Sequence, residues 1–162
     1  MISNIDFALM SFAYKIGNLF RNSSGLLDEL DIKKDYTVID YGCGPGRHIK
    51  KASALVGDSG IVHAVDIHKI AIKSIRKLIR KENLKNVIPV FADGYSTIIE
   101  SDTADIIYAL DMFHQVKHPV PFLEELCRLA KDSGLLIIDD GRQPREKAKK
   151  KIQTSNLWEI VE

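Results

Sequence analysis

A glycine loop that follows an apolar run is the part of this sequence best suited to do chemistry. Residues 38–46 read VIDYGCGPG, with glycines at positions 42, 44 and 46. Glycine adopts positive φ and lets a ligand approach the backbone, and the helix after the loop offers free N–H groups. A tight turn alone would also use glycine, but three glycines at alternate positions favour ligand contact. The third glycine comes too early for the G-x-G-x-x-G of a dinucleotide site, which disfavours NAD.

Acidic residues follow the next two apolar runs. Asp66 ends IVHAVD, twenty residues beyond Gly46, where a carboxylate can accept hydrogen bonds from both hydroxyls of a ribose. The alternative is that Asp66 is the N-cap of a helix beginning near His68 or Lys69. Asp93 and Gly94 end FADG, and this pair is either a second ligand contact or a common turn.

A histidine and further carboxylates follow the last two runs. Asp111 ends DIIYALD, and His114 comes three residues later. His114 is a weak candidate for a general base, because an unperturbed histidine titrates near neutral pH; a surface or helix-capping histidine fits equally well. Asp139 and Asp140 could bind a metal or a cationic substrate, or cap the next helix. We expect no metal site, because the histidines and cysteines lack metal-ligand spacing.

Strands that alternate with helices must position these residues. The alternation predicts an α/β fold of three layers, α/β/α, with a mainly parallel sheet covered on both faces. The expected strands are TVIDYG, IVHAVDI, NVIPVFAD, ADIIYALD and GLLIIDDG, and the expected helices are GRHIKKASALVG, HKIAIKSIRKLIRKEN, PVPFLEELCRLAKD and PREKAKKKIQTS. The C-terminal ends of parallel strands share one edge, so the chemistry-bearing residues should meet there.

Length and composition predict one domain over residues 1–162. Hydrophobic residues make up 45% of the chain and charged residues 28%, with a net charge of +1, so no global positive field favours nucleic acid. We expect a small-molecule substrate and no nucleic acid partner. Asp6 and Lys15 break the apolar N-terminus too early for a membrane span. Two cysteines without a disulfide framework favour a reducing, cytoplasmic setting.

The VIDYGCGPG motif resembles the first motif of the class I, Rossmann-like methyltransferases that depend on S-adenosylmethionine (SAM). The similarity is strongest over residues 36–141 and is closest to the small-molecule methyltransferases. It implies SAM as the cofactor and S-adenosylhomocysteine as the product. It also implies cofactor-binding positions at Asp40, Gly42, Cys43, Gly44, Gly46, Asp66, Ile67, Asp93, Gly94 and Asp111.

The resemblance also implies what these positions do. In the family the glycine loop wraps the methionine part of the cofactor, and an acidic residue, here Asp40, orients the loop and the amino group. Asp66 matches the residue that binds the ribose, and Ile67 the apolar residue that packs on the adenine. Asp93 and Gly94 match the position that reads the adenine amino group. The segment that begins at Asp111 matches the one that faces both cofactor and substrate.

Both ends of the chain lie outside this core. Residues 1–31 are expected to form an N-terminal helical cap, with one helix within residues 1–20 and a short one at 26–30. Residues 142–162 are expected to form a shortened C-terminal helix and one strand, Leu157–Val161, whereas family members add a sixth and an antiparallel seventh strand. The missing seventh strand would leave the fifth-strand edge open. Leu157–Val161 would then fill that gap or pair with a second subunit in a homodimer.

These observations predict a SAM-dependent methyltransferase that acts on an unidentified small-molecule acceptor, with the N-terminal helices as a lid. Methyl transfer from a sulfonium needs mainly the orientation of donor and acceptor, so no catalytic triad is required. The alternative is a SAM-binding protein without turnover, either regulatory or a degenerate methyltransferase, which the shortened C-terminus supports.

Overall fold

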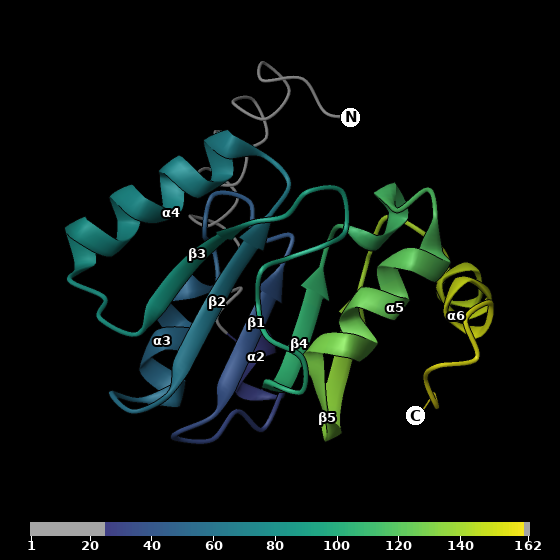
Figure 1. Ribbon diagram of the computed structural model, residues 1–162, viewed down its shortest axis with the longest axis horizontal. Helices are drawn as coiled ribbons and strands as arrows, with labels where there is room; N and C mark the ends of the chain where they lie inside the picture. Colours follow the sequence, from purple (N-terminus) through teal and green to yellow (C-terminus); the bar gives the residue numbers. More distant parts are fainter. Residues whose placement is uncertain (1–24, 161–162) are drawn as a thin grey trace.

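The computed structural model describes residues 25–160, which form a five-stranded sheet (Figure 1). All strand pairs are parallel, so the sheet predicted as mainly parallel is entirely so. The strand order is β3-β2-β1-β4-β5. The order reverses between β1 and β4, which creates a switch point where ligands bind in open α/β sheets. The strands are β1 (Thr37–Tyr41), β2 (Ile61–Asp66), β3 (Val87–Phe91), β4 (Ala104–Leu110) and β5 (Ala130–Asp139).

Helices cover both faces of this sheet, which confirms the predicted three-layer architecture. One face packs against α2 (Gly25–Asp28), α3 (Ile49–Val56) and α4 (Lys69–Glu82). The other packs against α5 (Pro119–Leu129), and α6 (Arg145–Gln153) extends this layer beyond β5 (Figure 1). A short 3₁₀ helix, η1 (Phe113–Gln115), follows β4.

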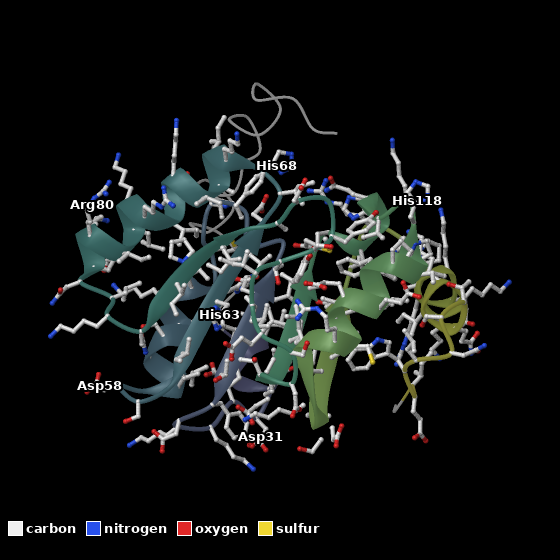
Figure 2. The ribbon with its side chains drawn as sticks, in the orientation of Figure 1. Asp31, Asp58, His63, His68, Arg80 and His118 are labelled. Carbon is white, nitrogen blue, oxygen red and sulfur yellow. The ribbon has the colours of Figure 1, made fainter. Side chains whose placement is uncertain are left out.

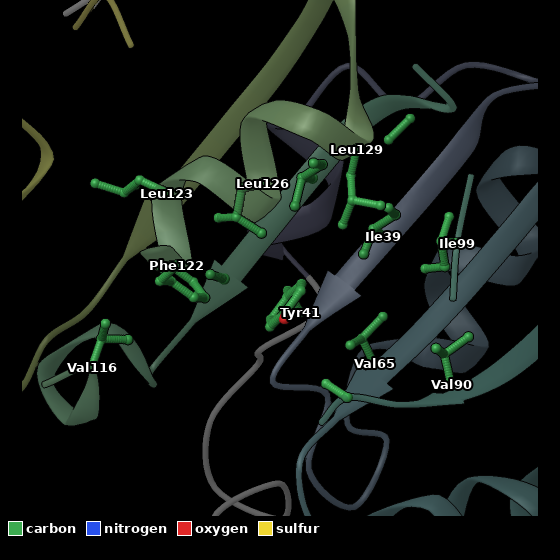
Figure 3. Packing of buried hydrophobic residues seen from close by; sticks show 14 of the residues in the cluster. Ile39, Tyr41, Val65, Val90, Ile99, Val116, Phe122, Leu123, Leu126 and Leu129 are labelled. Carbon is green, nitrogen blue, oxygen red and sulfur yellow. The ribbon is translucent and has the colours of Figure 1, made fainter. Parts of the chain in front are cut away.

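The strand sequences alternate between the two apolar cores. In β1, Val38 belongs to the core beneath α3, whereas Ile39 belongs to the core beneath α5, and both are fully buried. Successive side chains of a strand point to opposite faces, so a central strand of a covered sheet needs apolar residues at both parities. Figure 3 shows the α5 side, where Phe122 and Leu126 of α5 belong to the same apolar cluster as Ile39 and Tyr41 of β1.

The predicted C-terminal strand is wrong for the residues that the structure describes. Residues 157–160 have no regular structure, and Val161 lies outside the described residues. The Trp158 indole N–H donates to the Leu123 carbonyl at 3.2 Å, and its ring packs on the core beneath α5. A segment held against α5 in this way is not extended along β5. The part of the sheet that the structure describes therefore has β5 as an edge strand, with neither a sixth nor a seventh strand beside it.

β5 also begins earlier than predicted. Helix α5 ends at Leu129 and the strand starts at Ala130, although the sequence predicted helix through AKD. Ala130 pairs with Ala104, and an irregularity precedes the pairing of Leu135 with Ile106. The pairing with β4 therefore overrides the helical preference of these residues.

The N-terminal prediction is tested only in its last part. The helix expected within residues 1–20 lies outside the described residues. The short helix expected at 26–30 is found as α2, and its Leu27 is buried in the core beneath α3. Among residues 25–160, no helix is long and apolar enough to cross a membrane.

Candidate cofactor and substrate site

A pocket of about 680 Å³ lies at the edge of the sheet where β1, β2 and β4 end. Its volume is in the range of about 300–1,000 Å³ that is typical of small-molecule sites. In Figure 2, His68 and His118 are labelled at this edge, above the strand arrowheads, whereas Asp31 and Asp58 mark the opposite edge. The pocket is lined by residues 40–45, Arg47, His48, residues 66–68, Gly94, Tyr95, residues 110–112 and residues 114–118.

The glycine loop forms one wall of the pocket, and its three glycines serve different purposes. All three have positive φ. A Cβ on Gly46 would lie 2.7 Å from Ile75 Cδ1 of α4, and one on Gly42 would lie 2.8 Å from Met112 Cγ. A Cβ on Gly44 would have no neighbour within 4 Å. Gly46 and Gly42 therefore permit close packing, whereas Gly44 keeps backbone open at the pocket; Gly46 itself does not line it.

Asp66 links this loop to the start of α4. Its Oδ2 accepts the Gly44 N–H at 2.9 Å. Its Oδ1 accepts the His68 N–H at 2.8 Å and lies 3.0 Å from His68 Nδ1. The N-cap of α4 is His68, so Asp66 lies two residues before the cap and is not the N-cap itself. A carboxylate has about four lone-pair positions, so Asp66 can still accept a hydrogen bond from a ligand in the pocket.

Asp40 is a buried carboxyl group on the pocket wall. It is 3% exposed, and its Oδ2 has no hydrogen-bond partner among the described residues. Burial, reinforced by the negative charge of Asp66, raises the pKa of Asp40 to about 8. A buried carboxylate without a partner is costly. A cationic group in the pocket would supply the missing partner, which is what the sequence resemblance implied for the amino group of SAM.

The residues after β2 and β3 are placed differently from one another. Ile67 lines the pocket and is 45% exposed, so it offers an apolar surface to a ligand. Gly94 also lines the pocket, but Asp93 does not. The Asp93 backbone exchanges two hydrogen bonds with Ser96, so this residue belongs to a turn. A contact between the Asp93 side chain and the adenine therefore stays a prediction.

The segment after β4 forms a second wall of the pocket, beside the glycine loop. Asp111 adopts a φ of 56°, and its N–H donates to the Asp139 carbonyl at 2.8 Å. This conformation turns the chain sharply from β4 into η1. Lys151 of α6 then donates to the carbonyls of Phe113 and Val116, at 3.1 and 3.3 Å. The C-terminal helix thus fixes a wall of the pocket.

His114, which follows β4, and Asp140, which follows β5, are brought together at this edge of the sheet because the two strands are parallel neighbours. His114 Nδ1 lies 3.0 Å from Asp140 Oδ1, and the His114 backbone N–H donates to Oδ2 of the same carboxylate. Asp140 also accepts the Arg142 N–H at 3.1 Å and the Gln143 Nε2 at 3.0 Å. The Asp140 side chain is 1% exposed, whereas that of His114 is 22% exposed and lines the pocket. The two residues form a histidine–carboxylate pair.

Several lining residues were missed by sequence reasoning. Five of them are basic: Arg47, His48, His68, Lys117 and His118. Burial, helped by Arg47, lowers the pKa of His48 to about 4, so His48 is neutral at pH 7. The pairing of His114 with Asp140 was also missed, because the two residues are 26 positions apart. Their place directly after β4 and β5 was the available signal.

The cysteines have no reactive role in this site. Cys43 lines the pocket but is buried, and burial, reinforced by Asp40 and Asp66, raises the pKa of its thiol well above the usual value. A thiol in this state is a poor nucleophile, because the thiolate is the reactive form. Residues 25–160 contain no cluster of three or more histidine, cysteine or acidic residues that could hold a metal.

The fold and the pocket define a Rossmann-like ligand-binding domain whose donor set fits SAM. Asp40 offers an unpartnered buried oxygen for an amino group, Gly44 keeps open space at the backbone, and Ile67 offers an exposed apolar face. The sequence model of a methyltransferase domain family matches residues 32–161. The chain therefore belongs to this family of class I SAM-dependent methyltransferase domains.

Individual relatives agree with this assignment. The crystal structure of a SAM-dependent methyltransferase from Aquifex aeolicus superposes with a TM-score of 0.75 at 26% identity, over 88% of this chain and 86% of that one. A protein-L-isoaspartate O-methyltransferase from Methanococcus maripaludis is 26% identical over 72% of this chain and 52% of its own length. A tRNA U34 carboxymethyltransferase from Pasteurella multocida is 25% identical over 70% of this chain and 35% of its own. The chain thus spans about a third to a half of these two curated relatives.

Proposed function

We propose that the protein is a SAM-dependent methyltransferase that methylates a small molecule. The observation that carries this proposal is that the glycine loop and the segment after β4 line one pocket. A donor held at the glycine loop and an acceptor held at residues 111–118 would then share a single cavity. Holding the two reactants in one geometry is the main requirement of methyl transfer, in which the sulfonium supplies an activated methyl group.

The cofactor contacts follow from the placement of the carboxyl groups. Asp40 would accept the amino group of SAM, and Asp66 would accept a ribose hydroxyl while it holds the Gly44 N–H. Ile67 would pack on the adenine, with Gly94 and Asp93 near the adenine amino group. The backbone of Gly42, Cys43 and Gly44 would wrap the methionine part, with Gly46 supporting the loop from below and Asp111 closing the opposite side.

A small-molecule acceptor is preferred although two relatives carry the names of enzymes that act on protein and on tRNA. The net charge of +1 gives no overall attraction to nucleic acid. Residues 111–118, the acceptor wall, are part of a concave pocket and not of an exposed face. Both features favour an acceptor that enters the pocket whole.

A calorimetric titration with SAM, S-adenosylhomocysteine and NAD tests the cofactor. We expect saturable binding of both adenosyl ligands and none of NAD. Binding of NAD alone would contradict the proposal. Formation of S-adenosylhomocysteine in the presence of acceptors would then separate a methyltransferase from the second candidate, a SAM-binding protein without turnover.

We also propose that β5 pairs with a second copy of the chain. β5 is an edge strand of the described sheet, and its Leu135 is 56% exposed. An edge strand with unpaired backbone groups is a template for another strand unless something covers it. Pairing of two β5 strands across a twofold axis would join the two sheets and satisfy both edges.

A further inference from the structure

The histidine–carboxylate pair, His114 and Asp140, gives the acceptor wall a group that can take a proton from the acceptor. Asp140 accepts N–H groups of the His114 backbone, the Arg142 backbone and the Gln143 amide. These groups can only donate, so the Asp140 oxygens act as acceptors in all three contacts. His114 Nδ1, 3.0 Å from the same carboxylate, must then carry the proton in this contact. The neutral ring is left with its lone pair on Nε2.

Hydrogen bonds hold both Asp140 and the backbone around His114 in position. The Asp140 side chain is almost fully buried, and its two oxygens are held by donors from its own loop and from η1. The backbone on either side of His114 is held by Lys151, which contacts the carbonyls of Phe113 and Val116. A base works efficiently only when its acceptor nitrogen is fixed in position. The structure thus holds the His114 imidazole in a fixed orientation in the wall of the pocket.

We propose that His114 is the general base of methyl transfer, that Asp140 is its positioning residue, and that the acceptor is a small molecule methylated on a hydroxyl group. This inference rests on the proposed function. The acceptor O–H bond breaks while its oxygen bonds to the methyl carbon, and the proton moves to His114 Nε2. The electron pair of the broken sulfur–carbon bond stays on the sulfur. His114 then returns the proton to water.

Basic side chains on the acceptor wall favour a hydroxyl acceptor. Lys117 and His118 line the pocket on the same segment as His114, and Asp111 is the one carboxylate of that segment. Asp140, the carboxylate that contacts His114, is already bonded to N–H groups. Lys117 would stabilise an acceptor oxygen that becomes negative as its proton leaves.

The first test is independent of turnover. The ¹⁵N chemical shifts of histidine-labelled protein report which ring nitrogen carries the proton. We expect His114 to be protonated on Nδ1 when neutral, and we expect Asp140→Asn to shift it toward the other tautomer. The His114→Gln variant assigns the signal. An Nε2-protonated His114 in the unmodified protein would overturn the proposal.

The second test uses two classes of acceptor with SAM. 4-Hydroxybenzoate and catechol carry a hydroxyl proton, whereas pyridine and dimethyl sulfide have no proton on the atom to be methylated at neutral pH. We expect methylation of the hydroxyl compounds. His114→Gln should lower this rate at least about 100-fold, and Asp140→Asn should lower kcat more than it raises KM. The matched control is His63→Gln, in β2 outside the pocket, which should retain full activity.

The outcomes separate this inference from the proposed function. Methylation of the hydroxyl compounds that persists in His114→Gln, or methylation of the proton-free compounds only, would overturn the role of His114 and leave a methyltransferase. SAM binding in calorimetry without methylation of any compound would overturn both. A protein that does not bind SAM would contradict the proposed function, whatever tautomer His114 adopts.

Discussion

Asp66 combines two tasks in one carboxylate, because it holds the glycine loop and faces the pocket. We expect Asp66→Ala to weaken SAM binding by about 1.5–3 kcal/mol, the cost of losing a charged hydrogen bond to a ribose hydroxyl. Calorimetry measures this change. Asp58→Ala, at the opposite edge of the molecule (Figure 2), is the control and should bind SAM normally. Unchanged affinity in Asp66→Ala would rule out the ribose contact.

The same experiment separates the two tasks of Asp66. Asp66→Asn keeps an oxygen that can accept the Gly44 N–H, whereas Asp66→Ala removes it. If loop support dominates, the asparagine variant should bind SAM nearly as well as the native protein. If the negative charge of Asp66 at the ribose hydroxyl contributes most of the affinity for SAM, both variants should bind SAM weakly.

Asp40 makes the stability of the protein depend on pH. Its pKa is raised to about 8, mainly by burial, so the folded state binds a proton that the unfolded state has released above pH 4. Stability from this group is therefore complete at low pH and is lost as the pH rises to about 8, at up to about 1.4 kcal/mol per pH unit. We expect Asp40→Asn to be more stable than the native protein at pH 8 and similar to it at pH 4.

Thermal unfolding of both proteins between pH 4 and pH 9 measures this effect. A stability difference that does not change with pH would show that Asp40 is ionised throughout the range. Because the buried carboxyl group lowers stability at pH 8, we expect it to serve ligand binding. The stable Asp40→Asn variant should therefore bind SAM more weakly than the native protein.

At the scale of the element, the glycine loop depends on two different properties of its glycines. Gly46 packs against Ile75 of α4, whereas Gly44 borders open space in the pocket. We expect Gly46→Ala to destabilise the fold by about 2–4 kcal/mol, from overpacking and from its positive φ. Gly44→Ala should cost only the backbone contribution, about 1–2 kcal/mol, yet it should weaken SAM binding because its methyl group enters the pocket.

Denaturant unfolding and calorimetry on the two variants check these expectations. Each variant is the control for the other, since both add one methyl group to the same loop. Equal losses of stability would contradict the packing role of Gly46. Unchanged SAM binding by Gly44→Ala would place the ligand elsewhere in the pocket.

At the scale of the whole molecule, the open edge of β5 should decide the oligomeric state. We expect sedimentation velocity at micromolar concentration to give a dimer. Leu135→Lys, on β5, should shift the protein to monomer, because a lysine on an edge strand opposes pairing. Ile88→Lys on β3, the other edge strand, is the matched control and should remain dimeric. A native protein that is a monomer would refute pairing through β5.

Much of this molecule could be predicted from the order of its residues. The alternation of β-rich runs with amphipathic segments located all five strands and the helices between them. Glycines at 42, 44 and 46, with Asp66 after the second strand, indicated where a ligand would meet the backbone. The strand and helix predictions succeeded because strand and helix periodicity are local properties. The glycine loop and Asp66 line one pocket because parallel strands end at one edge whatever their order.

Tertiary structure decided the features that depend on contacts between distant residues. Trp158 holds the C-terminal segment against α5, so the predicted last strand does not form in the described residues. The pairing of Ala130 with Ala104 begins β5 where the sequence favoured helix. His114 meets Asp140 only because β4 and β5 are neighbours that end at the same edge. Local sequence determined the elements and the loop, while the order of the strands determined which side chains share a hydrogen bond.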